Sequence, residues 1–201
     1  CWTHTNTMKV LAVNSSARRD GNTAILINRV FEELNKEGIE TEMIQLAGQM
    51  IEPCKACWAC GGQENCVHRK DSFREIFDKM KEADGIILGS PVYTANVSAN
   101  MQAFLERASV VTDMNREAGL FRHKVGAAVT AARRGGAVNA LDAMNHFFLL
   151  QEMFVVGSCY WPLAYGQMSG DVQNDKEGMN TMSVLGKNMA CLLKALDRKE
   201  K

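Results

Sequence analysis

Four of the seven cysteines in this 201-residue sequence lie within one short segment, and cysteine thiolates are strong metal ligands. They follow the spacing Cys54-x2-Cys57-x2-Cys60-x5-Cys66. Compact runs of this kind hold cubane iron–sulfur clusters, whereas a structural zinc site usually joins two Cys-x2-Cys pairs across a longer spacer. The spacing therefore favours a [4Fe–4S] site in a loop at residues 53–67 over zinc or free thiols.

The remaining candidate metal ligands receive a plainer interpretation. His68 follows the cysteine-rich loop, and a lone histidine there is expected to face solvent rather than bind metal. Cys159 and Cys191 lie in apolar surroundings and are expected to be buried packing residues. We expect a cytoplasmic protein, in which clustered cysteines hold metal more often than they form disulfides.

A second chemical signal is a polar segment, residues 15–23, between an apolar run and an amphipathic stretch. Its hydroxyls, Arg18 and the first amides of the following helix can all point at one phosphate. The glycine-rich run and the lysine of a nucleotide P-loop are missing. The candidate phosphate-binding residues are Ser16, Arg18, Asn22 and Thr23. A hydrophilic turn in which Asn22 caps the helix is the alternative.

Two later loops suit a flat heterocycle, which needs a flanking wall and backbone hydrogen bonds to its edges. Residues 90–98 offer hydroxyls, amides and one aromatic ring, or alternatively they only shape a turn. In residues 130–136, two glycines allow close approach of the backbone, and Arg133 can face an anionic ring edge or lie in solvent. The candidates from both loops are Pro91, Val92, Tyr93, Thr94, Asn96, Ala132, Arg133, Gly135 and Gly136.

Alternating strands and helices must position these loops. Apolar runs predict strands at residues 9–13, 39–46, 85–89, 124–130 and 153–157. Helical spacing predicts helices at residues 22–38, 97–109, 137–150 and 177–196, the first ending at Gly38. It also predicts a helix capped by Asp71, with an apolar face of Phe73, Ile76, Phe77 and Met80. This alternation predicts an α/β, flavodoxin-like sandwich with a five-stranded parallel sheet of order 2-1-3-4-5 and helices on both faces. The loops after the first, third and fourth strands then meet at one sheet edge.

Composition excludes several classes of function. Lys plus Arg and Asp plus Glu each number 23, so no net charge attracts nucleic acid. No apolar stretch reaches the length of a membrane span. We expect residues 1–7 to be a disordered leader and residues 8–201 to form a single domain.

The motifs together resemble the iron–sulfur flavoprotein branch of the NADPH-dependent FMN reductase family, over about residues 8–196. The resemblance rests on three motifs: Ser16-x-Arg18-x-x-Gly21-Asn22-Thr23, Gly89-Ser90-Pro91-Val92-Tyr93 and the four-cysteine run. It implies FMN, with its phosphate near the first motif and its ring bordered by residues 91–96 and 132–136. It also implies homodimers or homotetramers, in which a cluster can approach the FMN of a neighbouring subunit. Ala17 departs from the family pattern, which often has proline there.

The residues and the resemblance together imply an FMN-dependent oxidoreductase that passes electrons between FMN and a [4Fe–4S] cluster. A ferredoxin-like protein or a small acceptor is the expected partner, and no catalytic acid or base is required. One alternative is an NAD(P)H-dependent FMN or quinone reductase without a cluster. Another is a zinc-binding or thiol redox sensor on the same fold. The aromatic segment at residues 160–165 can cover a flavin, serve an oligomer interface or pack in the core.

Overall fold

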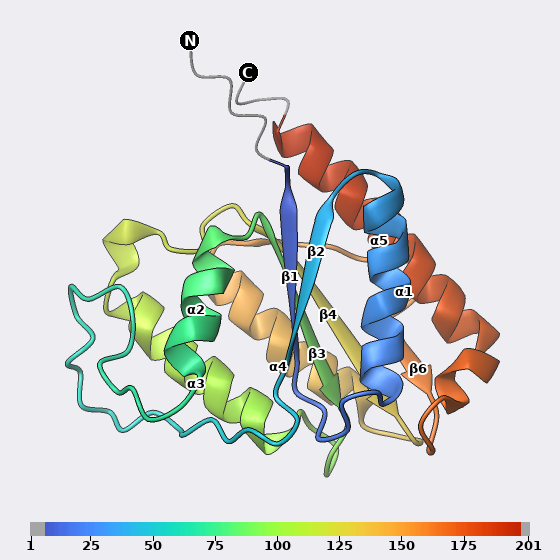
Figure 1. Ribbon diagram of the computed structural model, residues 1–201, viewed down its shortest axis with the longest axis horizontal. Coiled ribbons are helices and arrows are strands. Elements are labelled where there is room, and N and C mark those ends of the chain that lie inside the picture. Colours follow the sequence, from blue (N-terminus) through green and yellow to red (C-terminus); the bar gives the residue numbers. More distant parts are fainter. Residues whose placement is uncertain (1–6, 198–201) are drawn as a thin grey trace.

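The computed structural model describes residues 7–197 as a twisted sheet between two layers of helices (Figure 1). Residues 1–6 of the expected leader lie outside the described residues. The elements are β1 (Lys9–Asn14), α1 (Asn22–Lys36), β2 (Glu40–Gln45), α2 (Phe73–Glu82), β3 (Gly85–Pro91), α3 (Ala99–Asp113), η1 (Arg116–Ala118), β4 (Val125–Ala132), α4 (Ala137–Leu150), β5 (Phe154–Val155), β6 (Leu163–Tyr165), η2 (Asp171–Asn174) and α5 (Lys176–Asp197). Within residues 7–197, no helix is long and apolar enough to cross a membrane.

The parallel strands have the order β2-β1-β3-β4-β5, so the predicted flavodoxin-like topology is confirmed. The prediction of one fifth strand at residues 153–157 was wrong in extent. β5 has only two residues, both exposed, and β6 pairs with the later part of β4. The chain leaves the sheet between them and returns at Pro162, whose carbonyl accepts the N–H of Thr130 at 3.0 Å. Proline has no N–H for the ladder, which suits this edge position.

Alternate residues of the fully buried strands supply two separate cores. Leu11 and Val13 of β1 face α2, α3 and α4, whereas Val10 and Ala12 face α1 and α5. The predicted apolar face of α2 is buried, and it consists of Phe73, Ile76, Phe77 and Met80. Burial on both faces explains why these strands are continuously apolar.

Helices α1 and α5 pack together around a buried carboxylate. The side chain of Glu33 accepts hydrogen bonds from Lys36 at 3.1 Å and from Ser183 on α5 at 2.9 Å, and it pairs with Arg29. These donors, Lys36 first and then Ser183, lower the pKa of Glu33 to about 2. The helix pair that supports β1 and the loop after it is therefore joined by an ionised group.

The structure also bears on three other predictions from the sequence. Asp71 does cap the start of α2, since its Oδ1 accepts the N–H of Phe73 at 3.3 Å, although it lies two positions before the helix and also pairs with Arg107. Cys159 and Cys191 are exposed rather than buried, since Cys159 follows the departure from the sheet and Cys191 lies on the outer side of α5. The aromatic side chains of residues 160–165 are about half-exposed, whereas Leu163 and Ala164 of the same segment pack in the two cores.

Candidate functional site

The loops after β1, β3 and β4 line one cavity of about 140 Å³ at the carboxyl edge of the sheet, hereafter the edge pocket. Eight of the thirteen residues predicted to bind a cofactor lie on its wall: Ser16, Arg18, Asn22, Thr23, Pro91, Val92, Tyr93 and Arg133. The other five do not line the cavity: Thr94, Asn96, Ala132, Gly135 and Gly136. Parallel strands that end together at one edge bring these distant segments to the same place.

The candidate phosphate-binding segment, residues 15–23, contains a buried hydroxyl without a hydrogen-bond partner in the described chain. Thr23, the second residue of α1, is 1% exposed, and its Oγ1 has no hydrogen-bond partner in the described chain. The N-cap residue Gly21 provides no side-chain cap, and the first turn contains no acidic residue. A buried hydroxyl beside uncapped helix amides fits an oxyanion such as a phosphate. Ser16 shapes the loop, because its Oγ accepts the N–H of Arg18 at 3.1 Å.

A segment after β6 covers this loop, a contact that the sequence did not predict. The amide of Asn22 donates to Met168 O at 2.9 Å and accepts from the N–H of Gly170 at 2.9 Å. Gly166 and Gln167 line the edge pocket beside it. Asn22 therefore holds this segment with its side chain and retains its backbone N–H for a ligand. No recognisable motif marks the segment, because β6 itself was not predicted.

The loop after β3 ends in a tight turn that is held against the loop after β4. Tyr93 and Asn96 exchange backbone hydrogen bonds of 2.9 and 3.0 Å, and Thr94 and Ala95 between them have φ values of 48° and 59°. Turns of this kind favour Asn-Gly, so non-glycine residues here carry backbone strain. A Cβ on Gly136, which has φ 91°, would lie 2.6 Å from Ala95 Cα. Glycine is required for this close packing.

Buried hydroxyls join the ends of the strands whose loops line the edge pocket. Ser98, the N-cap residue of α3, donates from its Oγ to Ser15 Oγ at 2.8 Å, and Ser15 Oγ donates to Gly89 O at 3.1 Å. The N–H of Ser98 donates to Ser90 Oγ at 2.9 Å, and Thr130 Oγ1 donates to Ser90 O at 2.7 Å. The ends of β1, β3 and β4 and the start of α3 are thus held in one network.

All four motif cysteines line a second pocket, hereafter the cysteine pocket, together with His68. Cys60 and Cys66 are buried, Cys54 is half-buried and Cys57 is exposed. Burial raises the pKa of the Cys60 thiol, and the other three cysteines are near enough to add to the increase. His68 is half-buried, with Nε2 3.5 Å from Cys57 Sγ, so the expectation that it faces solvent was wrong in part.

The donor set suits a multi-iron cluster. Among residues 7–197, no three His, Cys, Asp or Glu side chains are grouped closely enough to hold one metal ion. A cubane cluster binds each thiolate at a different iron, so its ligands stand further apart than those around a single ion. Four thiols around one pocket therefore fit the cluster in both number and chemistry.

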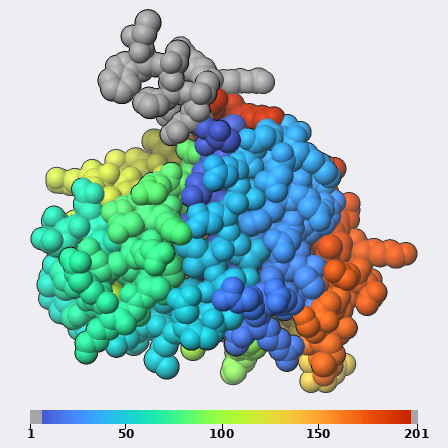
Figure 2. Space-filling model, viewed as in Figure 1, coloured from blue at the N-terminus to red at the C-terminus, as the bar shows by residue number. Residues whose placement is uncertain are grey.

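The cysteine loop has no strand or helix and is attached to α3 by side chains. Asn100 accepts the N–H of Ile51 at 3.1 Å, and Glu106 accepts the N–H of Cys54 at 3.1 Å. Asn115, just beyond α3, donates to the carbonyl of Cys60 at 3.0 Å. Figure 1 shows this segment running past α2 and α3, and Figure 2 shows it forming one flank of the molecule. The polar residues of α3 position the loop.

Arg107 of α3 also contacts this loop, and its side chain is buried, with 3% exposure. Its Nε donates to Cys66 Sγ at 3.1 Å, and its Nη1 contacts Asp71 Oδ2 at 2.6 Å. Burial opposes its charge, but the hydrogen bonds to Cys66 and Asp71 raise the pKa of Arg107 above its ordinary value. Sequence reasoning missed this residue, although Arg107 follows Phe104 by three positions and precedes Val111 by four, on the buried face of the helix.

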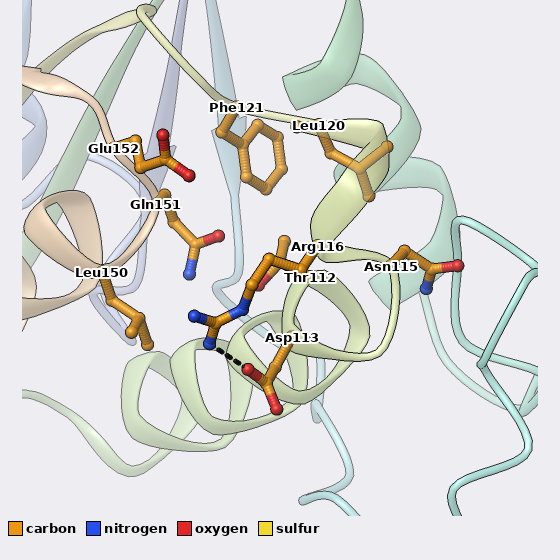
Figure 3. A pocket seen from close by; sticks show the side chains of 10 residues that line it. Thr112, Asp113, Asn115, Arg116, Leu120, Phe121, Leu150, Gln151 and Glu152 are labelled. Carbon is orange, nitrogen blue, oxygen red and sulfur yellow. Dashed lines mark hydrogen bonds and ion pairs between the residues drawn. The ribbon is translucent and has the colours of Figure 1, made fainter.

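A further pocket lies apart from both sites, between the end of α3, η1 and the end of α4 (Figure 3). Its volume is about 100 Å³, and no predicted site residue lines it. Gln151 Nε2 is buried there without a hydrogen-bond partner in the described chain, and Arg116 pairs with Asp113. An amide group of this kind can be satisfied by water, so the pocket gives no indication of chemistry.

Comparison with solved structures places the molecule among flavodoxin-like proteins. A flavodoxin, WrbA-like protein from Agrobacterium tumefaciens superposes with a TM-score of 0.64 at 16% identity, covering 94% of this chain and 98% of the other. At this identity the likeness concerns the fold alone.

Sequence comparison is more specific. The family model for NADPH-dependent FMN reductase matches residues 8–167. An iron–sulfur flavoprotein from Methanocaldococcus jannaschii is 38% identical, covering 95% of this chain and all of its own. Another from Methanosarcina thermophila is 30% identical, covering 95% of this chain and 98% of its own. The chain therefore belongs to the iron–sulfur flavoprotein branch of the NADPH-dependent FMN reductase family and is a flavin-dependent oxidoreductase.

Proposed function

We propose that this chain binds FMN in the edge pocket and a [4Fe–4S] cluster in the cysteine pocket, and that it transfers electrons between them. The observation that carries the proposal is that a chain of this family gathers four cysteines with ferredoxin-type spacing around one pocket. Its relatives from Methanocaldococcus jannaschii and Methanosarcina thermophila, both named iron–sulfur flavoproteins, support the same function. When bound, FMN supplies hydride or two-electron exchange, and the cluster supplies one-electron transfer.

The residues of the edge pocket would hold FMN at two ends. The free amides of the first turn of α1, with the hydroxyls of Ser16 and Thr23, suit the phosphate, and Arg18 would neutralise its charge. The turn at residues 93–96 and the backbone of residues 133–136 would border the ring. No side chain there is required as an acid or base.

The partners in this proposal are a second copy of the chain, in a homodimer or homotetramer, and a ferredoxin-like protein or small acceptor. Exposed apolar side chains beside the cysteine pocket support a docking role, because Trp58 is 59% exposed and Val67 is 37% exposed. A cytoplasmic location is part of the proposal, since thiolates persist there.

The family description favours one second candidate, an NAD(P)H-dependent FMN or quinone reductase. In that case NADPH would bleach the flavin rapidly, and Cys57→Ser would bleach at the wild-type rate. In the two-cofactor function, Cys57→Ser would instead lose transfer to a one-electron acceptor while retaining FMN.

Anaerobic purification with a visible spectrum and with iron, sulfide and FMN analysis tests the proposal. We expect flavin bands over a broad shoulder, and about four iron atoms per chain. Cys57→Ser should lose iron, whereas Cys191→Ser, an exposed cysteine outside the loop, should retain it. Flavin without iron in the wild-type chain would reject the cluster, and one zinc per chain without flavin would favour the thiol or zinc sensor.

A further inference from the structure

Arg107 directs all three of its guanidinium nitrogens at the cysteine loop and its borders. Besides the Nε hydrogen bond to Cys66 Sγ, Nη2 donates to His68 O at 3.0 Å and Nη1 donates to Glu52 O at 3.3 Å. Nη1 also pairs with Asp71 Oδ2 at 2.6 Å. One buried side chain therefore fixes both ends of the loop and one of its sulfurs.

Asp71 completes this arrangement. Its side chain is 5% exposed, and it accepts the backbone N–H of Glu52 at 2.8 Å and that of Phe73 at 3.3 Å. The Arg107 guanidinium lies 4.3 Å from the ring centroid of Phe73, which restricts its plane. A lysine ammonium cannot reproduce the planar fork that reaches these separate acceptors.

The hydrogen bond to Cys66 has an electrostatic consequence. Reduction of a cluster adds negative charge, and a donor to a ligand sulfur stabilises the reduced form more than the oxidised form. A buried positive charge acts in the same direction, whereas the carboxylate of Asp71 acts against it. The two side chains therefore have opposite effects on the potential of a group bound at Cys66.

We propose that Arg107 is a positioning residue that fixes Cys66 Sγ and raises the reduction potential of the cluster, with Asp71 as the opposing charge. The inference rests on the proposed function, because it takes the cysteine pocket to hold the cluster. It concerns binding and potential rather than turnover. Arg107 acts through Cys66 and donates no electron or proton.

The test compares four variants of the anaerobic holoprotein: Arg107→Gln, Arg107→Lys, Asp71→Asn and the control Arg122→Gln. Redox titration should give a more negative midpoint for Arg107→Gln and a less negative one for Asp71→Asn. Transfer of iron to a chelator should be roughly 10–100-fold faster in Arg107→Gln, the usual scale for groups that orient metal ligands. Arg107→Lys should stay near the wild-type potential yet lose iron faster. Arg122, whose exposed ion pair is with Glu152, should change neither quantity.

Loosening of the fold cannot shift the potential in opposite directions in the two variants. Shifts of the same sign, or no shift, would overturn the proposal. If circular dichroism shows that Arg107→Gln does not fold, the other two variants decide. Asp71→Asn should have a less negative midpoint potential, and Arg107→Lys should lose iron faster at a nearly unchanged potential. If the wild-type chain takes up no iron, the proposed cluster function fails. Thiol labelling of the metal-free chain then decides the positioning role, which requires Cys66 to react faster in Arg107→Lys.

Discussion

The edge pocket and the cysteine pocket are built in different ways. Backbone hydrogen bonds between β1, β3 and β4 bring the loops of the edge pocket together, because each of these loops directly follows its strand. The cysteine loop contains no strand or helix, and polar side chains, including the buried Arg107, attach it to α3. The sheet determines the geometry of the first site, whereas a few side chains determine that of the second.

Helix α3 belongs to both sites. Its N-cap residue Ser98 joins the hydroxyl network at the ends of the strands that carry the edge-pocket loops, and Arg107 reaches the cysteine pocket. Nine residues at a rise of 1.5 Å place these positions about 14 Å apart along the helix axis. A rigid helix therefore holds the two pockets in a fixed relation while each is built independently.

The largest expected effect is on the free energy of unfolding, through the buried pair that holds the cysteine loop. Asp71→Ala leaves the charge of Arg107 buried and unpaired, so we expect the metal-free protein to lose about 3–5 kcal/mol in free energy of unfolding. Urea denaturation measures the change. Glu152→Ala, which removes the partner of exposed Arg122, should lower the free energy of unfolding far less. Equal losses in the two variants would show that the cysteine loop does not depend on the buried pair.

The helix layer behind β1 has its own buried carboxylate, with a smaller expected effect. Glu33→Gln should cost about 2 kcal/mol near neutral pH, because the charged hydrogen bonds to Lys36 and Ser183 are lost. The pKa of Glu33 is lowered from 4.5 to about 2 in the folded protein. Its contribution is therefore complete above pH 4.5 and is lost as the pH falls toward 2.

Stability curves across this pH range should be flatter for Glu33→Gln than for the wild-type protein. Glu32→Gln is the matched control, since Glu32 is 61% exposed and also pairs with Arg29. A wild-type slope in Glu33→Gln would contradict the assignment of this titration to Glu33.

The same contrast explains what the sequence could predict. Apolar strands and helical spacing predicted the topology and brought Ser16, Pro91 and Arg133 to one cavity, because sheet geometry follows from local pattern. The cysteine spacing predicted a shared pocket because the four cysteines lie close together in the sequence. Arg107 and Asp71 are 36 residues apart and meet only in the folded chain, so no spacing rule indicated their pairing. β6 was missed because it is three residues long and follows an irregular segment.

Two buried threonines, Thr23 on α1 and Thr112 on α3, allow effects on FMN binding to be separated from effects on stability. Thr23→Val removes no hydrogen bond from the ligand-free chain, so its free energy of unfolding should not fall, while FMN should bind about tenfold more weakly, or about 1.4 kcal/mol. Thr112→Val removes hydrogen bonds to Ala108 O and Ser109 O and should lose about 1 kcal/mol of stability with unchanged FMN affinity. Fluorescence titration and urea denaturation measure the two quantities. Equal FMN affinity in Thr23→Val and the wild-type chain would remove Thr23 from the phosphate site.

The smallest expected effect compares strained alanines in the two loops. Ala95 in the edge-pocket turn and Ala56 in the cysteine loop have φ values of 59° and 49°. Glycine relieves this strain but adds freedom to the unfolded chain, so each Ala→Gly variant should gain only about 0.5 kcal/mol in free energy of unfolding. The added backbone freedom makes the neighbouring pocket less preorganised. Ala95→Gly should therefore weaken FMN binding about twofold, whereas Ala56→Gly should speed iron loss. A change in FMN affinity of the same size in Ala56→Gly would show that the two loops are coupled, most directly through α3, and not built independently.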